Sequence, residues 1–175
     1  MHTALVIVDL TFGDAGKGSI TDALVRRGAN LVVRYNGGAQ AAHTVFDQAG
    51  RCHIFHQFGS GTLVEGVEIL LSRFMMVNPL ALHYEELELR EIGIPDAAER
   101  MFIDARALVT TPYHMIANRL REIARGANRH GSCGLGIGET AADALDFAAN
   151  VIRYGNLNIP ALLKRKLAWH RDLKL

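Results

Sequence analysis

Residues 13–19 read Gly13-Asp14-Ala15-Gly16-Lys17-Gly18-Ser19, and this stretch decides the fold. An apolar run at residues 4–8 precedes it, and a helix-like stretch at residues 20–27 follows it. Glycines let backbone N–H groups converge on an anion, and the N-terminus of a helix adds partial positive charge. The order of strand, glycine loop and helix therefore predicts a phosphate site, to which Lys17 brings a full charge.

The loop differs from the Walker A motif, which reads G-x-x-x-x-G-K-[ST]. That motif requires Gly at position 11 and Ser or Thr at position 18, where this chain has Thr11 and Gly18. Asp14 adds a carboxylate that can hold Mg²⁺ or accept a proton. The sequence thus predicts a loop that does more than cradle phosphate.

The composition is that of an ordinary globular protein. The chain has 175 residues, 49% of them hydrophobic and 21% charged, and a formal net charge of +1. It has no apolar stretch near the roughly 20 residues that span a bilayer, and its N-terminus lacks the basic region of a signal peptide. Cys52 and Cys133 show no disulfide spacing and are typical of reduced thiols in a cytosolic protein. We expect a cytoplasmic protein that binds neither membrane nor nucleic acid.

Short apolar runs alternate with amphipathic segments, a pattern typical of an α/β fold with a mostly parallel sheet flanked by helices. Asn78 and Pro79 form a helix start, and Gly93 and Gly126 stand where helices end. The pattern predicts strands at residues 4–9, 31–35, 53–55, 69–71 and 101–103, and helices at residues 19–27, 79–92 and 113–125.

We expect residues 1–126 to form an α/β phosphate-binding core. Residues 127–175 would add a Gly-rich loop and an irregular helical segment of the same domain, apparently truncated. The pattern of residues 160–175 predicts a basic helix. A solvated face is favoured there over a nucleic-acid or membrane contact.

A second glycine-containing segment, residues 35–44, follows the second predicted strand and ends in His43 and Thr44. In a parallel sheet the carboxyl ends of strands share one edge, so the two loops should meet. Asp14 and His43 are then a candidate base and acid beside a phosphate pocket. Taken singly, a structural histidine and a turn aspartate remain open alternatives.

Residues 131–138 contain four glycines, Ser132 and Cys133. They form either another anion-binding loop or a flexible linker, and composition alone leaves both open. Cys133 has no evident His partner, which favours a bystander over a nucleophile.

Five segments, in order, resemble the adenylosuccinate synthetase family. Residues 13–19 are similar to its G-D-E-G-K-G-K, and residues 37–44 to its G-G-N-N-A-G-H-T. The other matches are residues 103–106 with 112–114 (S-D-R-A-H…P-Y-H), residues 131–138 (G-T-T-G-R-G-I-G) and residues 153–157 (R-V-G-D-L).

The resemblance implies a P-loop-like fold and a GTP-dependent carbon–nitrogen ligase of purine biosynthesis. In this family GTP phosphorylates the 6-oxygen of IMP, aspartate displaces the phosphate, Mg²⁺ is required and the enzyme is a homodimer. Asp14 would be the base and a Mg²⁺ ligand, His43 the acid, and the Ala42 carbonyl a second metal ligand. Lys17 would assist catalysis by holding phosphate oxygens. The implied nucleotide- and phosphate-binding set is Gly13, Asp14, Ala15, Gly16, Lys17, Gly18, Ser19, Gln40, Ala41, Ala42, His43, Thr44 and Cys133.

Departures from the family gather on the substrate side. Ala15 replaces a Glu, Ala39 and Gln40 replace two Asn, Cys133 replaces a phosphate-binding Thr, and Leu135 replaces an Arg. This pattern indicates an altered purine nucleotide, a relative of IMP, and leaves room for another amino acid in place of aspartate.

Family enzymes are also much longer than this chain. A truncated nucleotide-binding module or partner subunit without independent catalysis is therefore the alternative to the ligase. A relative that joins an amino acid to a small non-nucleotide metabolite is a third hypothesis.

Overall fold

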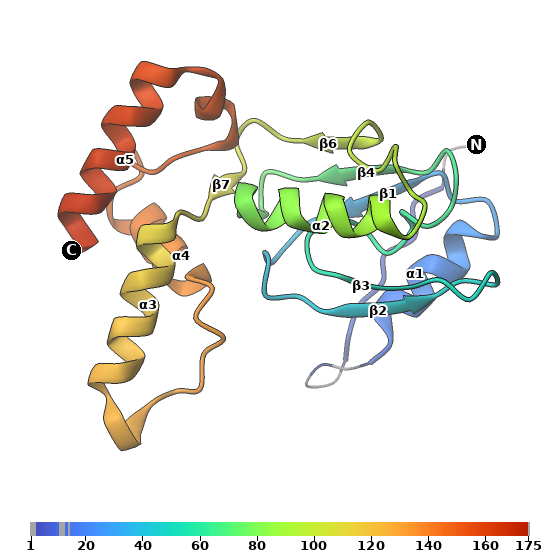
Figure 1. The fold of residues 1–175 in the computed structure, drawn as a ribbon, viewed down its shortest axis with the longest axis horizontal. Coiled ribbons are helices and arrows are strands. Elements are labelled where there is room, and N and C mark those ends of the chain that lie inside the picture. The colour runs from blue at the N-terminus through green and yellow to red at the C-terminus, as the bar shows by residue number, and fades with distance from the viewer. Residues whose placement is uncertain (1–2, 11–12, 14, 175) are drawn as a thin grey trace.

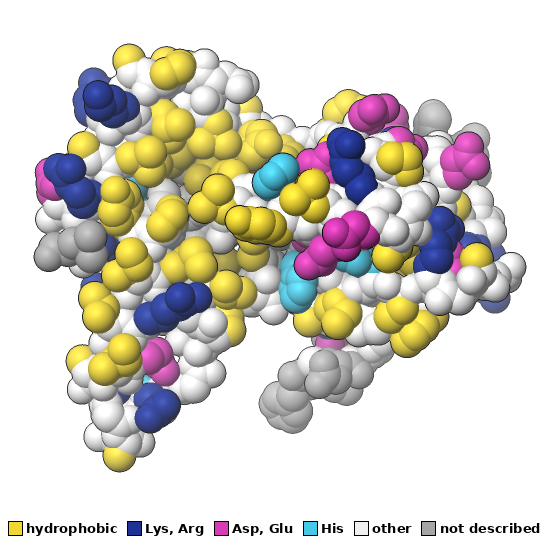
Figure 2. Space-filling model, viewed as in Figure 1, with side chains coloured by type: hydrophobic (Ala, Val, Ile, Leu, Met, Phe, Trp, Pro, Cys, Tyr) yellow, Lys and Arg dark blue, Asp and Glu magenta, His cyan; other side chains and the backbone are white. Residues whose placement is uncertain are grey.

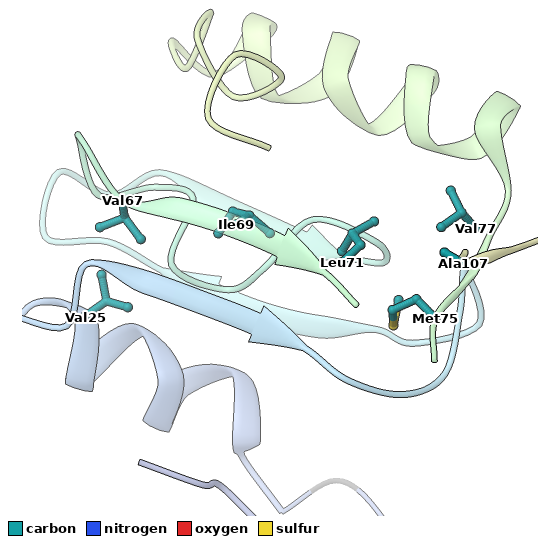
Figure 3. Close-up of a cluster of buried hydrophobic side chains, with 7 residues drawn as sticks. All are labelled: Val25, Val67, Ile69, Leu71, Met75, Val77 and Ala107. Carbon is teal, nitrogen blue, oxygen red and sulfur yellow. The ribbon is translucent and has the colours of Figure 1, made fainter. Parts of the chain in front are cut away.

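The computed structural model describes residues 3–10, 13 and 15–174 (Figure 1). Its centre is a three-stranded parallel sheet in the order β1 (Leu31–Arg34), β4 (Glu68–Leu71) and β6 (Met101–Ile103). Helices α1 (Lys17–Val25) and α2 (Pro79–Glu91) lie on opposite sides of this sheet (Figure 3). The predicted α/β class with a parallel sheet flanked by helices is confirmed.

Two smaller strand pairs complete the β structure. An antiparallel hairpin joins β2 (His43–Phe46) to β3 (Cys52–Phe55), and α2 packs on it through Leu89. The short strands β5 (Met76–Val77) and β7 (Leu108–Val109) pair in parallel.

The C-terminal part, residues 112–174, is helical and lies to one side of the sheet (Figure 1). It contains α3 (Pro112–Ala124), α4 (Ile137–Asp146) and α5 (Pro160–Lys174), with the 3-10 turns η1 (Gly126–Asn128) and η2 (Tyr154–Asn158). Hydrophobic side chains gather over this helical part on the face shown in Figure 2. No helix in the described part of the chain combines the length and apolarity needed to cross a bilayer.

The main core joins α1 to the parallel sheet. Apolar side chains from the end of α1, from β4 and from the segments beyond it pack together and exclude water (Figure 3). They are Val25, Val67, Ile69, Leu71, Met75, Val77 and Ala107, each at most 5% exposed.

The predicted helix signals lie where the helices begin and end. The Asn78 side chain accepts hydrogen bonds from the N–H groups of Leu80 and Ala81, both at 3.2 Å, and so caps α2. Gly93 follows α2 with φ +88°, a conformation that a residue with a side chain rarely adopts. The start and the end of α2 were therefore readable from the sequence.

The predicted strand at residues 4–9 is wrong. The described residues there take no strand conformation, and the exposed fraction of Val6 is 75%. The segment and β1 both line a cleft of about 1,110 Å³, and the described residues of the segment pair with no strand. An apolar run marks a tendency to be buried, whereas a strand also needs a partner for its backbone groups.

Helix α4 was not predicted, because residues 137–138 belong to a glycine-rich stretch that favours a loop. It begins directly after Gly136, whose φ is +74°. The loop prediction for residues 131–138 is thus wrong at its last two residues.

Candidate functional site

The first predicted loop leads into α1. Gly16 precedes the helix with φ +73°, and no side chain caps it. The first N–H groups of a helix have no partner within the helix, so this end can receive an anion. Gly13, Ala15, Gly16 and Ser19 are exposed. Asp14 lies outside the described residues.

Gly18 brings the first loop against the second. A Cβ atom at Gly18 would lie 2.8 Å from the Cβ of His43 and 3.2 Å from the Oγ of Ser60. The distance of 2.8 Å is shorter than real Cβ atoms show, so only glycine allows His43 to approach this closely. Segments around residues 18, 43 and 60 therefore converge at the N-terminus of α1.

Lys17 forms an ion pair with Asp9. Asp9 lies on the segment before the loop, and its side chain is 13% exposed, against 35% for that of Lys17. The cation expected to hold phosphate thus has a carboxylate beside it. Any anionic ligand must displace Asp9 from the Lys17 ammonium or share that group with it.

His43 lies at the start of β2 among positive groups. Burial lowers the pKa of its imidazole, and the charges of Arg34, Lys17 and His56 lower it further. The arrangement therefore favours the neutral imidazole near neutral pH, a form that has one N–H to donate. Cations around a neutral imidazole are suited to a ligand that brings negative charge.

The second loop exposes most of its predicted site residues. Gln40, Ala42 and Thr44 are exposed, whereas Ala41 is half-buried. The Ala41 carbonyl accepts a hydrogen bond from Nδ1 of His56. The Ala41 carbonyl therefore anchors the second loop, while the other three residues face solvent.

The third glycine segment is occupied by a carboxylate of the chain itself. The N–H groups of Gly131 and Ser132 donate to Oε2 of Glu122, at 2.9 and 3.3 Å. Cys133 is exposed. These two amides, which an anion-binding loop would offer to a ligand, thus meet Glu122.

The end of the third segment reaches the second loop. A Cβ at Gly38 would lie 2.6 Å from Cδ1 of Ile137, the first residue of α4. The structure therefore brings the first two loops together through Gly18 and His43, and joins the third to them through Ile137 rather than through Cys133.

Sequence reasoning missed Asp9, Arg34, His56 and Ser60. Asp9 was visible as a charge that interrupts an apolar run, and Ser60 lies between Gly59 and Gly61. A charged residue in an apolar run and a serine between two glycines are the signals that could have marked them.

The chain has an α/β fold in which two glycine loops meet at a helix N-terminus, an arrangement typical of proteins that bind phosphate. The family model for adenylosuccinate synthetase matches residues 6–174, and the chain belongs to that family. Two curated relatives are adenylosuccinate synthetases. The one from Marinomonas sp. (strain MWYL1) is 39% identical over 157 residues, and the one from Chlorobium limicola is 38% identical over 167 residues. The alignments cover 90% and 95% of this chain but only 35% and 37% of those proteins.

Two solved structures show the same fold. The fully ligated adenylosuccinate synthetase from Plasmodium falciparum aligns with a TM-score of 0.77 at 23% identity, over 93% of this chain and 38% of that one. The cyanophage S-2L succinoaminodeoxyadenylate synthetase, bound to dGMP and dATP as an energy donor, aligns with a TM-score of 0.64 at 21% identity. It covers 86% of this chain and 40% of that one.

Proposed function

We propose that the chain is the N-terminal, phosphoryl-transfer part of an adenylosuccinate synthetase-like ligase. Such an enzyme phosphorylates the 6-oxygen of a purine nucleotide with GTP, and the amino group of aspartate then displaces phosphate. The observation that carries the proposal is the contact of Gly18 with His43. It joins two glycine loops, of the kind that bind phosphate, at one helix N-terminus. Family membership supports it.

The chemistry needs charge stabilisation and alignment more than covalent help from the protein. Lys17 and the amides at the start of α1 would hold phosphate oxygens. His43, kept neutral by burial and by cations, would donate its N–H to the transferring phosphoryl group. Asp14 would take the proton from the purine ring as the 6-oxygen attacks. Gly13, Ala15, Ser19, Gln40, Ala41 and Thr44 would line the nucleotide.

Mg²⁺ fits the proposed donors. The ion prefers oxygen ligands, and the Asp14 carboxylate and the Ala42 carbonyl would supply two, with phosphate oxygens supplying others. Exposure of Ala42 is consistent with this role. When bound, the ion would neutralise charge on the phosphate oxygens.

We propose IMP or a close relative as the nucleotide, aspartate or another amino acid as the nucleophile, a homodimer as the assembly and the cytoplasm as the location. The nucleotide could differ from IMP because Cys133 and Leu135 lack the hydroxyl and the guanidinium of the family. A nucleotide-binding module without catalysis is the second candidate, since the chain spans little more than a third of the relatives' length.

The test is a turnover assay of the purified chain. Mg²⁺, GTP and aspartate are mixed with IMP, dGMP or another purine monophosphate, and phosphate release is measured, with His43→Ala as the control. Release that depends on one nucleotide and on His43 supports the ligase. GTP binding without release from any mixture favours the module, and failure to bind GTP contradicts both.

A further inference from the structure

Glu85, on α2, has a buried carboxylate that accepts hydrogen bonds from three successive backbone N–H groups. Glu85 is only 3% exposed. The N–H groups of His56, Gln57 and Phe58 donate to its two oxygens at 2.8, 2.7 and 3.2 Å. A buried charge is costly unless it is hydrogen-bonded, so this carboxylate and this segment hold each other in place.

Arg34 holds the same segment from its carbonyl side. One guanidinium nitrogen, Nη1, donates to the carbonyl oxygens of His56 and Phe58, at 2.8 and 3.2 Å. Residues 56–58 are therefore held between a carboxylate that accepts their N–H groups and a cation that donates to their carbonyls.

The buried Gln57 ties the segment to the start of α2. Its side-chain amide donates to the Asn78 carbonyl at 3.0 Å and accepts from the Asn78 N–H at 2.8 Å. Since both partners are at most 4% exposed, water cannot readily replace these bonds. The segment has little freedom to move.

From this segment two contacts lead to the phosphate loops. The ring of His56 donates from Nδ1 to the carbonyl of Ala41, because a carbonyl oxygen can only accept. Ala41 is two residues before His43. Ser60, two residues beyond Phe58, lies beside Gly18 in the first loop.

We propose that Glu85 is a positioning residue for the phosphoryl site. By fixing residues 56–58 it fixes the His56 ring that holds the Ala41 carbonyl, and with it the loop that carries Ala42 and His43. The identity of the ligand at that loop rests on the function proposed above, whereas the positioning itself does not.

Glu86 provides a matched control on the same helix. It has the same charge, and its Oε1 pairs with Arg90 at 2.7 Å, on the helix surface. Glu85→Gln and Glu86→Gln therefore make the same chemical change, but only the first places an amide N–H₂ against backbone N–H donors. A purely structural role for Glu85 would loosen the whole chain, whereas a positioning role loosens the loops first.

The experiment measures amide hydrogen exchange and calorimetric affinity for Mg²⁺-GTP in the wild-type chain and both variants. In Glu85→Gln we expect exchange to rise about tenfold in residues 38–46 and 56–61 while α3–α5 keep their protection, and affinity to fall about tenfold. Glu86→Gln should match the wild type in both measurements.

His56→Ala keeps the backbone N–H that Glu85 accepts and removes the ring contact to Ala41. It should reproduce the loss of affinity, and the double variant Glu85→Gln/His56→Ala should lose little more than either single variant, because both act through one contact. If Glu85→Gln does not fold, His56→Ala alone still tests the proposal.

The proposal is overturned if exchange rises evenly across the chain, or if His56→Ala has wild-type exchange in residues 38–46 and wild-type affinity. A wild-type chain that does not bind Mg²⁺-GTP contradicts the proposed function instead. The exchange comparison then still decides whether Glu85 positions the loop.

Discussion

Gly18 and His43 are in direct contact, and the absence of a side chain at Gly18 is what permits it. We expect Gly18→Ala to force the two loops apart, because its methyl group would meet the Cβ of His43 at 2.8 Å. The cost should be about 1–3 kcal/mol of unfolding free energy, with weaker binding of Mg²⁺-GTP. Urea unfolding and calorimetry measure the two effects.

Gly138 provides the control for that substitution. It lies in α4 with nothing within 4 Å of its Cβ position. Gly138→Ala should therefore raise the unfolding free energy by about 0.5–1 kcal/mol, since alanine is the better helix former. Equal destabilisation by Gly18→Ala and Gly138→Ala would contradict the importance of the contact with His43.

Asp9 competes with an anionic ligand for Lys17. We expect Asp9→Asn to tighten the binding of pyrophosphate about fivefold at low salt, because the ion pair with Lys17 and the like charge near the ligand are both removed. Lys17→Met should weaken the same binding. Titration calorimetry at two ionic strengths measures both affinities. Weaker pyrophosphate binding in Asp9→Asn than in the wild type would show that Asp9 supports the ligand rather than competing with it.

Glu122 occupies the amides of the third loop. Glu122→Gln keeps the shape of the side chain but weakens its hydrogen bonds to the N–H groups of Gly131 and Ser132. We expect the variant to bind IMP several-fold more tightly, because a 5′-phosphate no longer competes with a carboxylate. An unchanged or lower affinity would place the nucleotide phosphate elsewhere.

A buried cluster between α3, α4 and α5 makes stability depend on pH. Nδ1 of His114 accepts from the Thr111 N–H at 2.9 Å. The ring proton is therefore on Nε2, which donates to Asp143 at 3.1 Å and is not free to ligate a metal. His170 Nδ1 lies 3.3 Å and Lys174 Nζ 2.6 Å from the same carboxylate. Lys174 also pairs with Glu139, which in turn pairs with Arg121.

Burial lowers the pKa of His114 to about 4 and also lowers that of His170. A histidine with a lowered folded pKa stabilises the fold fully above its unfolded pKa near 6.5, and that stability is lost as pH falls towards 4. We expect a loss of about 3 kcal/mol from His114 across this interval, seen by urea unfolding at pH 7.5 and 4.5.

His170→Leu provides the comparison for the pH series. It removes an imidazole that is fully buried and whose Nδ1 lies 3.3 Å from the Asp143 carboxylate. The pH dependence of the variant should be shallower than that of the wild type. Equal slopes would mean that His170 does not take up a proton in this range.

The sequence predicted the elements that local signals define. The cap at Asn78, the glycine at Gly93 and the buried run of β4 lie where the pattern placed them. It failed for residues 4–9, because burial of an apolar run depends on a neighbouring strand that local pattern does not reveal. Helix α4 was missed because its N-terminus is built from glycines that meet α3, a contact distant in sequence.

For the candidate site, glycine patterns indicated two loops, and the contact at Gly18 shows that they meet. The pattern did not reveal Glu85 or Arg34, because their partners are backbone groups more than 20 residues away. Such partners are set by the tertiary fold, and a single sequence carries no periodic signal for them.

Calorimetric titration of Mg²⁺-GTP into the wild-type chain, Lys17→Met and Gly18→Ala tests most directly whether the two loops form one site. We expect binding that requires Mg²⁺ and that each substitution weakens about tenfold or more, with both variants still folded by circular dichroism. Binding that persists without Mg²⁺ and is unchanged in both variants would contradict the two-loop phosphate site.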